Sequence, residues 1–367
     1  MMIYIAVILL FSLLVIIHEW GHFMAARRGG VTVEEFGVGF PPKVWGKVRR
    51  GVLYSINLLP LGGFVRLKGE DGDDTSKGSF GAAKTWTKTK ILLAGVVMNL
   101  ITAVVLFYGL AVTGMPGLGS LEPGFLAHTY SQAPKLVVAD VAKDSPAAQA
   151  GIKNGEYIVS ANDKAMATND DLRTFTKDNA GQTVKLIIEK GGEGTREVMV
   201  KLRDPGSTQG YLGVVGQQDY KLKYDPITAV AAAVWVTGAL FFATIVGVFK
   251  LLVGIPMLVI GLFSSSVPAA AAEAAGPLGI LFIFKSISTL GISYVTLLLA
   301  NIAVALAAFN VLPLPALDGG RLALIWWQRL TGRKISADTE AQIHGIGFMV
   351  LLGLMALITV YDFRKFF

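Results

Sequence analysis

The chain has 367 residues, of which 53% are hydrophobic and 16% are charged, and it carries a formal net charge of +7 and no cysteine. Soluble globular proteins carry roughly a quarter charged residues, so this chain lacks the charge to cover a water-facing surface. The composition excludes a disordered chain, a fibrous repeat and a small disulfide-stapled fold. The absence of thiols also excludes a cysteine nucleophile and thiolate metal ligands.

The positive charge is concentrated in one stretch of the chain. Residues 27–90 hold 12 Lys and Arg against 6 Asp and Glu, whereas residues 114–225 hold 13 against 14. An excess of Lys and Arg between apolar segments is typical of a cytoplasmic loop in a membrane protein. No basic-aromatic motif accompanies the excess, so we expect a lipid bilayer and no nucleic acid as a partner.

Two apolar segments flank this basic stretch. Residues 1–26 are long enough to cross a bilayer, and the charged pair Arg27-Arg28 follows them, whereas a signal peptide has its positive residues in front. A second uncharged segment covers residues 91–112. We therefore expect residues 1–113 to form two transmembrane helices, with the N-terminus outside and a cytoplasmic loop between them.

The remaining chain divides into three parts. Residues 114–225 have mixed charges and short alternating runs, and they predict a soluble insert on the opposite side of the membrane from the basic loop. The apolar part 226–285 contains a segment, 227–263, that fits a transmembrane span, a hairpin or an amphipathic helix at the interface. In 286–367, we expect a transmembrane helix that carries Asp318, at the end of an uncharged stretch, and then a last transmembrane helix.

The predicted fold class is therefore a polytopic α-helical membrane protein with one inserted domain. The sequence indicates about four core transmembrane helices and one further hydrophobic segment whose placement the pattern leaves open. The last span covers residues 341–361.

The first apolar segment contains the motif His18-Glu19-Trp20-Gly21-His22. Positions i and i+4 of a helix share a face, so both imidazoles can point at one metal ion. Glu19 then lies where its carboxylate can act as general base toward a water molecule. The alternative is a pair of polar residues at a helix end. Ionisable groups within a membrane span are costly and usually functional, which favours the metal site.

A catalytic zinc site needs a third protein ligand, and the candidates are His128, His344 and Asp318. His128 lies in the soluble insert, and His344 opens the last span, where an interface position explains it. Asp318 follows 32 uncharged residues and two nearby prolines, Pro313 and Pro315, which cannot continue a regular helix. Unwound backbone at membrane depth must line a cavity, so Asp318 is the favoured zinc carboxylate; the alternative is a solvated helix cap.

Together these motifs resemble those of the site-2 protease family of intramembrane zinc metalloproteases, in its bacterial form with an extracytoplasmic PDZ domain. The stretch that begins at Asn310 is similar to the family motif NxxPxxxLDG. The resemblance implies that His18, His22 and Asp318 bind one zinc ion and that Glu19 is the general base. It further implies that Asn310 holds the substrate backbone or the developing oxyanion.

Two shorter stretches carry weaker resemblances. Residues 54–66 are similar to the family's membrane-dipping β-loop, and their alternating apolar residues around Pro60 suit a hairpin with a free edge. Such an edge can accept an extended peptide as an added strand; the alternative is an ordinary surface hairpin. Residues 276–279, Gly-Pro-Leu-Gly, resemble another family stretch or simply break a helix.

The insert resembles one PDZ domain. Residues 144–162 look like the PDZ signature, with a short helix from Ser145 and turns at the following glycines. Residues 168–177 predict a second helix opened by a Thr-x-x-Asp capping box. Residues 210–213 are similar to the carboxylate-binding loop of a permuted PDZ domain.

The resemblance implies a protease in a bacterial plasma membrane, with its active site toward the cytoplasmic side and the PDZ-like domain outside. Its substrates would be transmembrane segments of membrane proteins, such as pre-trimmed anti-sigma factors or remnant signal peptides, with the PDZ-like domain excluding bulky proteins. Two alternatives are a membrane zinc hydrolase of lipid or prenylated peptide and a non-catalytic PDZ membrane adaptor. For Asp318 to reach the zinc, an even number of crossings must separate the insert from its span, which an interface helix or a hairpin at 227–263 satisfies.

Overall fold

The computed structural model describes residues 2–70, 74–190, 194–207, 210–261, 276–288 and 290–366. The chain forms two compact units, of which unit 1 comprises Met1–Gly109 and Val230–Phe367 and unit 2 comprises Leu110–Ala229. Each unit has a hydrophobic core of its own.

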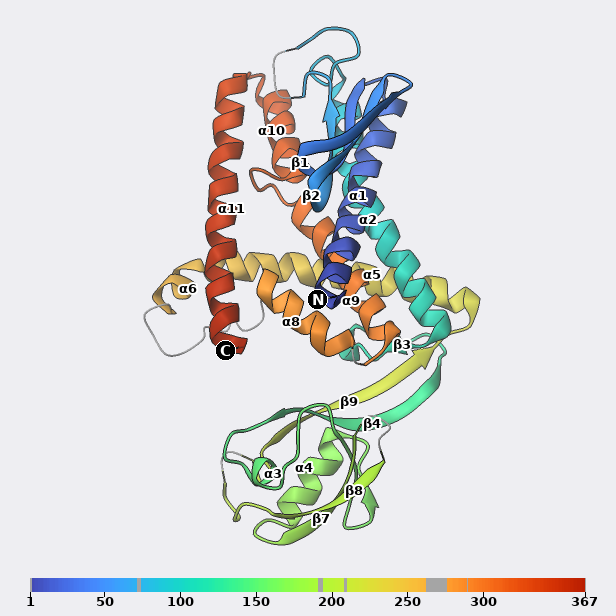
Figure 1. Cartoon of the computed structure of the whole chain (residues 1–367), viewed down its shortest axis with the longest axis vertical. Helices are drawn as coiled ribbons and strands as arrows, with labels where there is room; N and C mark the ends of the chain where they lie inside the picture. Colours follow the sequence, from blue (N-terminus) through green and yellow to red (C-terminus); the bar gives the residue numbers. More distant parts are fainter. Residues whose placement is uncertain are drawn as a thin grey trace. The chain divides into compact units, whose positions relative to one another are not determined.

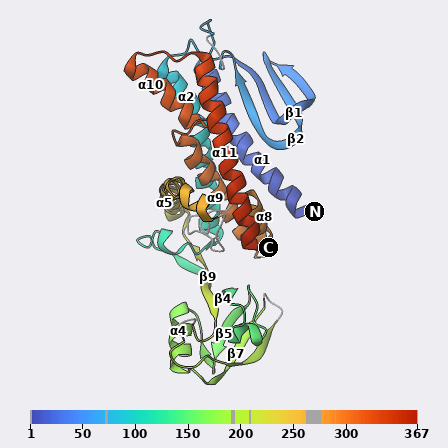
Figure 2. The same cartoon turned by 90° about the vertical axis from the view of Figure 1, so that its left-hand side faces the viewer.

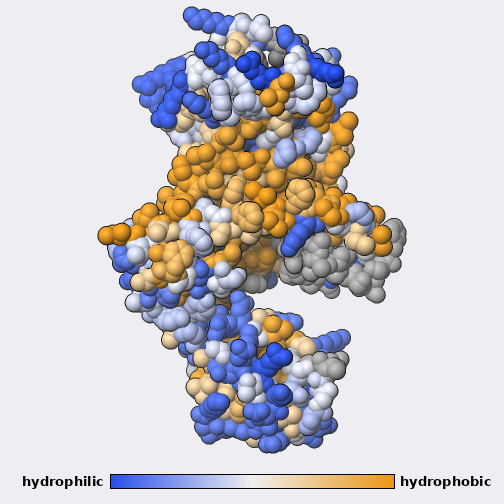
Figure 3. Space-filling model, turned by 180° about the vertical axis from the view of Figure 1, so that it is seen from behind, coloured by the Kyte–Doolittle hydropathy of each residue, from blue (hydrophilic) through white to orange (hydrophobic). Residues whose placement is uncertain are grey.

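Within the described residues, five helices are long and apolar enough to cross a membrane. They are α1 (Met2–Arg28), α2 (Thr85–Thr113), α5 (Pro226–Val253), α9 (Ile292–Val311) and α11 (Ala337–Phe366). Large apolar side chains such as Leu9, Val105 and Met349 are exposed on them. Figure 3 shows a broad apolar belt across unit 1, bordered by hydrophilic residues. A bilayer covers apolar surface on this scale, so the protein is a membrane protein with an inserted β-rich unit.

The segment 226–285 contains three helices in its described part. α5 is one continuous helix of 28 residues. It runs crosswise to α1 and α11 in Figure 1 and is seen almost end-on in Figure 2. The shorter helices α6 (Ile255–Gly261) and α8 (Pro277–Ser288) follow it. Because the amides of Gly276 and Gly279 donate to the buried carboxylate of Asp362 at 3.2 and 2.8 Å, the Gly-Pro-Leu-Gly stretch both begins α8 and anchors it to α11.

Asp318 does not lie on the apolar helix that precedes it. α9 ends at Val311, residues 312–317 are irregular, and Asp318 is the first residue of α10 (Asp318–Thr331). The unwound backbone that the prolines predict is therefore confirmed. The expectation that the aspartate belongs to a transmembrane helix is wrong, because the chain restarts a separate, more polar helix at this residue.

Two long strands, β1 (Val33–Arg49) and β2 (Val52–Leu67), follow α1 and lie beside it in Figures 1 and 2. Residues 35–38 pair on one side with residues 63–66 and on the other with residues 53–56. The predicted simple hairpin over 54–66 is therefore wrong, because β1 lies between its two arms. Residues 63–67 instead form an outer edge of the sheet.

Unit 2 is a sheet with two short α-helices. Its strand order is β3-β9-β4-β5-β7-β8, with β6 paired to β5. The elements are β3 (Met115–Pro116), a 3-10 turn (Gly119–Leu121), β4 (Thr129–Val141), α3 (Pro146–Gln149), β5 (Tyr157–Ala161), β6 (Lys164–Ala165), α4 (Asn169–Asp178), β7 (Thr183–Glu189), β8 (Thr195–Lys201) and β9 (Val214–Lys223). Fully buried Leu136, Ile158 and Leu186 lie in its core.

Both predicted helix starts in unit 2 are confirmed. The Ser145 hydroxyl accepts a hydrogen bond from Ala148 N at 3.1 Å and caps α3. At α4, the Thr168 hydroxyl accepts from Asp171 N at 3.0 Å, and the Asp171 carboxylate accepts from Thr168 N at 3.0 Å. These hydrogen bonds with Thr168 hold the pKa of Asp171 below its ordinary value, so its contribution to stability is present above that value and is lost as the pH falls.

The capping box predicts the effect of removing the Thr168 hydroxyl. Thr168→Ala removes the acceptor for a helix N–H, and we expect unit 2 to lose about 1 kcal/mol of unfolding free energy. Equilibrium unfolding of the full chain, followed by a signal from unit 2, measures this loss. Thr174→Ala makes the same chemical change at an exposed position inside α4 and serves as the control. A Thr168→Ala protein as stable as the Thr174→Ala protein would contradict the capping role.

Candidate metal centre

The two histidines of the HExxH motif lie one turn apart on α1. Both are buried, with 7% of His18 and 8% of His22 exposed. Their Nε2 atoms are 3.0 Å apart and their rings stand nearly perpendicular, at 80°. The helix therefore directs both nitrogen lone pairs at one point, as the i, i+4 spacing predicts.

Asp318 completes a triangle with these two nitrogens, although it is 300 residues from His18 in the chain. Its Oδ2 lies 3.1 Å from His18 Nε2 and 3.2 Å from His22 Nε2. Two imidazoles and a carboxylate around a tetrahedral zinc ion stand about 3.3 Å from one another, so the observed spacings fit the ion. The donor atoms also suit zinc, because imidazole nitrogens and carboxylate oxygens are common zinc ligands and their lone pairs converge on one point.

Helix α2 (Thr85–Thr113) forms the wall behind the two imidazoles. The carbonyl oxygen of Ile91 lies 2.8 Å from His22 Nδ1, and the amide nitrogen of Asn99 lies 3.1 Å from His18 Nδ1. Between them is Gly95, where an added Cβ would lie 2.5 Å from both His18 Cε1 and His22 Nε2. Only a glycine leaves room for both rings here.

A second glycine sets the distance between α1 and α2. A Cβ at Gly21 would lie 2.4 Å from the carbonyl oxygen of Ala94, so the backbones of the two helices are in contact. Small residues allow such an approach between membrane helices. The glycine inside the HExxH motif thus has a packing role of its own.

Glu19 is half-buried on α1 beside the sheet. A Cβ at Gly63 would lie 3.8 Å from Glu19 Cγ, so the edge strand 63–67 begins next to this carboxylate. The turn before it is fixed to the same helix: the Ser12 hydroxyl donates to the Pro60 carbonyl at 2.6 Å and accepts from Gly62 N at 3.2 Å. The sheet edge and the candidate base are therefore neighbours.

The other sequence candidates, in the described part of the chain, have hydrogen-bond partners other than the three atoms of the triangle. Asn310, in the last turn of α9, donates from its amide to the Leu306 carbonyl at 3.0 Å, which engages it with its own helix. His128 is exposed in unit 2, with Nδ1 3.0 Å from the Leu126 carbonyl.

His344 supports the loop that carries Asp318. Its Nδ1 accepts a hydrogen bond from Ala316 N at 2.9 Å, and Ala316 has a left-handed backbone with φ 75°. Three residues further along α11, a Cβ at Gly347 would lie 2.2 Å from Pro315 Cβ. α11 thus presses against an otherwise unfavourable turn and holds it in place.

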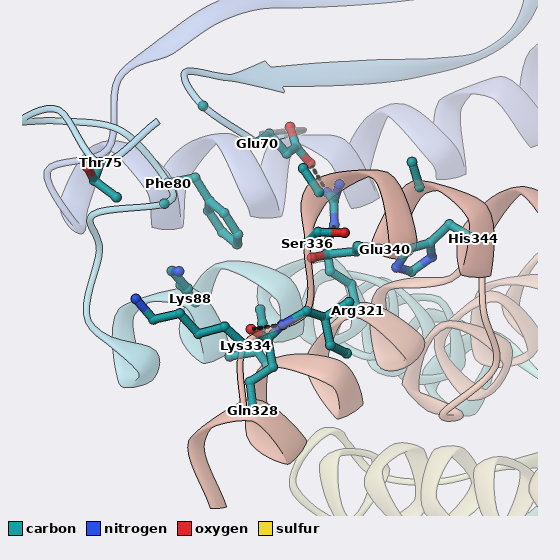
Figure 4. Close-up of a pocket in the computed structure, with 16 residues that line it drawn as sticks. Glu70, Thr75, Phe80, Lys88, Arg321, Gln328, Lys334, Ser336, Glu340 and His344 are labelled. Atoms are coloured by element: carbon teal, nitrogen blue, oxygen red, sulfur yellow. Dashed lines mark hydrogen bonds and ion pairs between the residues drawn. The ribbon is translucent and has the colours of Figure 1, made fainter. Parts of the chain in front are cut away.

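An ion pair fixes the first turn of α10. Arg321, three residues after Asp318, pairs with Glu70 at the exit of β2, and its Nε lies 4.0 Å from Glu340 on α11. These side chains, with Lys88 and His344, line a cavity of about 760 Å³, which Figure 4 shows between α10, the start of α11 and the loop after β2. These contacts join α10, which begins with Asp318, to the loop after β2 and to α11.

Comparison with known proteins decides the family. The sequence model of Peptidase family M50 matches residues 6–354 of this chain. The chain belongs to this family. This confirms the predicted membership of the site-2 proteases and identifies the chain as a metalloprotease by family.

Individual relatives agree with this assignment. A protein of Clostridium acetobutylicum, provisionally named a zinc metalloprotease, is 30% identical over 97% of this chain and 95% of its own length. A similar protein of Agrobacterium fabrum is 29% identical over 97% and 94%. The zinc metalloprotease RasP of Oceanobacillus iheyensis is 26% identical over 99% of both chains. Like the family match, these similarities extend over almost the entire sequence.

Two residues that touch the histidines, Gly95 and Asn99, are not among the sequence candidates, and His344 has a different role from the two considered for it. Gly95 and Asn99 belong to an otherwise apolar span. A polar residue in such a span is usually functional, so the sequence position of Asn99 already indicates a role for it. His344 was assigned to an interface, because nothing in the sequence shows that it faces Ala316.

The glycine at position 95 predicts a steric effect. Gly95→Ala places a methyl group against both imidazoles, and we expect overpacking to cost about 1–3 kcal/mol of unfolding free energy in detergent micelles. Gly109→Ala, on the same helix, is the matched control, because a Cβ there meets nothing within 4 Å. Equal stability of the two variants would show that α1 and α2 are not packed this closely.

Proposed function

We propose that this protein is an intramembrane zinc endoprotease that cleaves membrane-spanning segments of other membrane proteins. The observation that carries the proposal is the triangle of His18, His22 and Asp318 with Glu19 beside it, in a unit whose longest helices are apolar. The names of the M50 relatives support zinc as the single metal ion. Pre-trimmed anti-sigma factors and remnant signal peptides are the substrate types we propose.

Each site residue then has a definite task. Nε2 of His18, Nε2 of His22 and a carboxylate oxygen of Asp318 hold the ion. A bound zinc ion would supply Lewis acidity toward the scissile carbonyl and the attacking water. Glu19 removes the proton from the attacking water and delivers it to the leaving amine nitrogen. Asn310 has a second amide N–H besides the one donated to Leu306, and we assign it to the substrate backbone.

The substrate must be extended at the site, because a helix hides its amide bonds. The edge strand 63–67 supports this requirement, since it begins beside Glu19 and pairs with β1 on its other side. We propose that the unwound substrate adds to this edge as a further strand. Main-chain hydrogen bonds would then place the scissile bond near the metal with little dependence on sequence.

We propose a bacterial plasma-membrane location with the basic loop 27–90 and the active site toward the cytoplasm. Unit 2 is then extracytoplasmic, and α5 lies at the interface without crossing, which its crosswise direction within unit 1 supports (Figure 1). We further propose that unit 2 is a PDZ-like domain. The capped helices at Ser145 and Thr168 support this assignment.

If Glu19 is the general base and not a metal ligand, its substitution should strongly reduce cleavage without releasing the metal. Glu19→Gln should lower the cleavage rate of a transmembrane stub about 10²–10⁴-fold, because the proton acceptor is lost. Zinc content should remain at one ion per chain, whereas Asp318→Ala should lose zinc. Cleavage by purified protein in micelles and metal analysis provide the two measurements, and Glu34→Gln, an exposed glutamate of β1, is the control.

The same assay tests the alternatives. Undiminished cleavage by Glu19→Gln refutes the mechanism. A wild-type chain without zinc favours the PDZ adaptor, and a zinc-loaded chain that hydrolyses a lipid or prenylated peptide but no stub favours the membrane hydrolase.

Exclusion of bulky proteins by unit 2 predicts a dependence on substrate size. A folded domain fused to the outer end of the stub should slow cleavage at least about tenfold, because it must pass unit 2 before the segment reaches the site. The same domain fused to the cytoplasmic end is the control. Equal slowing by the two fusions would contradict a filter located outside the membrane.

A further inference from the structure

One stripe of α2 faces the histidines along its length. Ile91, Gly95 and Asn99 are spaced four residues apart and therefore share a face of the helix. The first meets His22 Nδ1, the second lies against both rings, and the third meets His18 Nδ1. The four-residue spacing of the histidines on α1 is thus matched by a four-residue spacing of their partners on α2.

The metal site requires one particular tautomer of each histidine. Because Nε2 of both rings faces Asp318, the lone pair for a metal must be on Nε2 and the proton on Nδ1. Nδ1–H then needs an acceptor, which fixes the tautomer and the ring orientation. For His22 this acceptor is the carbonyl oxygen of Ile91, at 2.8 Å.

For His18 the partner is the side chain of Asn99. This residue is 0% exposed, its amide group is 3.1 Å from His18 Nδ1, and its Oδ1 is buried without a hydrogen-bond partner in the described part of the chain. The two ends of an amide have nearly the same shape, so its orientation follows from the proton on the facing nitrogen. With the proton on His18 Nδ1, the oxygen of Asn99 turns to that nitrogen and accepts it.

We propose that Asn99 is a positioning residue that accepts the Nδ1–H of His18 and so presents Nε2 to the metal ion. The inference rests on the proposed function, because the tautomer matters only where a metal binds. It accounts for a fully buried amide in an apolar helix, where an unpaired polar group is costly. It also accounts for its place eight residues after Ile91, the acceptor for the other histidine.

Metal affinity of the purified full chain tests the proposal. We expect Asn99→Ala to weaken zinc binding about 10–100-fold, measured by competition with a chelator. The visible absorption of the Co²⁺-loaded protein should change as well, since it reports the geometry around the metal. Thr102→Ala, which removes a half-buried polar group from the same helix, is the control and should alter neither.

The conservative variant separates positioning from packing. Asn99→Asp offers a carboxylate oxygen to the same N–H and should recover the affinity and the spectrum that Asn99→Ala loses. If Asn99→Ala does not fold, Asn99→Asp is compared with Asn99→Leu, which has a similar size and no acceptor.

The outcomes are distinct. Metal affinity unchanged in Asn99→Ala, or equal in the Asp and Leu variants, overturns the inference while the proposed function stands. A wild-type chain that binds no zinc overturns the proposed function itself.

Discussion

The structure depends on the convergence of three electron-rich atoms within about one hydrogen-bond length of each other, among apolar helices. Two imidazole nitrogens and a carboxylate oxygen stand 3.0–3.2 Å apart at a place that water reaches poorly. Their lone pairs repel unless a cation or shared proton lies between them. The rest of unit 1 has to hold the three atoms together against this repulsion, and it does so from three sides.

Helix packing provides one side and an irregular loop provides another. Gly21 and Gly95 bring α1 and α2 into backbone contact, which places the α2 groups directly behind the rings. The loop 312–317 delivers Asp318 from a second direction. It requires two prolines and a left-handed Ala316, and His344 of α11 holds it through the Ala316 amide. The ion pair of Arg321 with Glu70 supplies the third restraint and connects α10 to the sheet.

The sheet is attached to this rigid centre. Its turn is tied to Ser12, seven residues before Glu19, and its edge begins beside the Glu19 side chain. This is the edge to which we propose that the substrate adds. Under the proposed function, the exposed apolar surface of the helices would face lipid, and the strand edge beside Glu19 would hold the extended substrate.

Local patterns in the sequence predict the apolar segments, the polar insert with its capped helices, the histidine pair and the unwound stretch before Asp318. These features depend on residues that are neighbours in the chain, through helical periodicity, proline geometry and capping hydrogen bonds. Tertiary structure decided the rest. The arms of 54–66 are separated by β1, Asp318 starts its own helix, and Asn99 and His344 act on residues 81 and 28 positions away. Contacts between distant segments leave no local pattern, because they depend on which helix faces pack together.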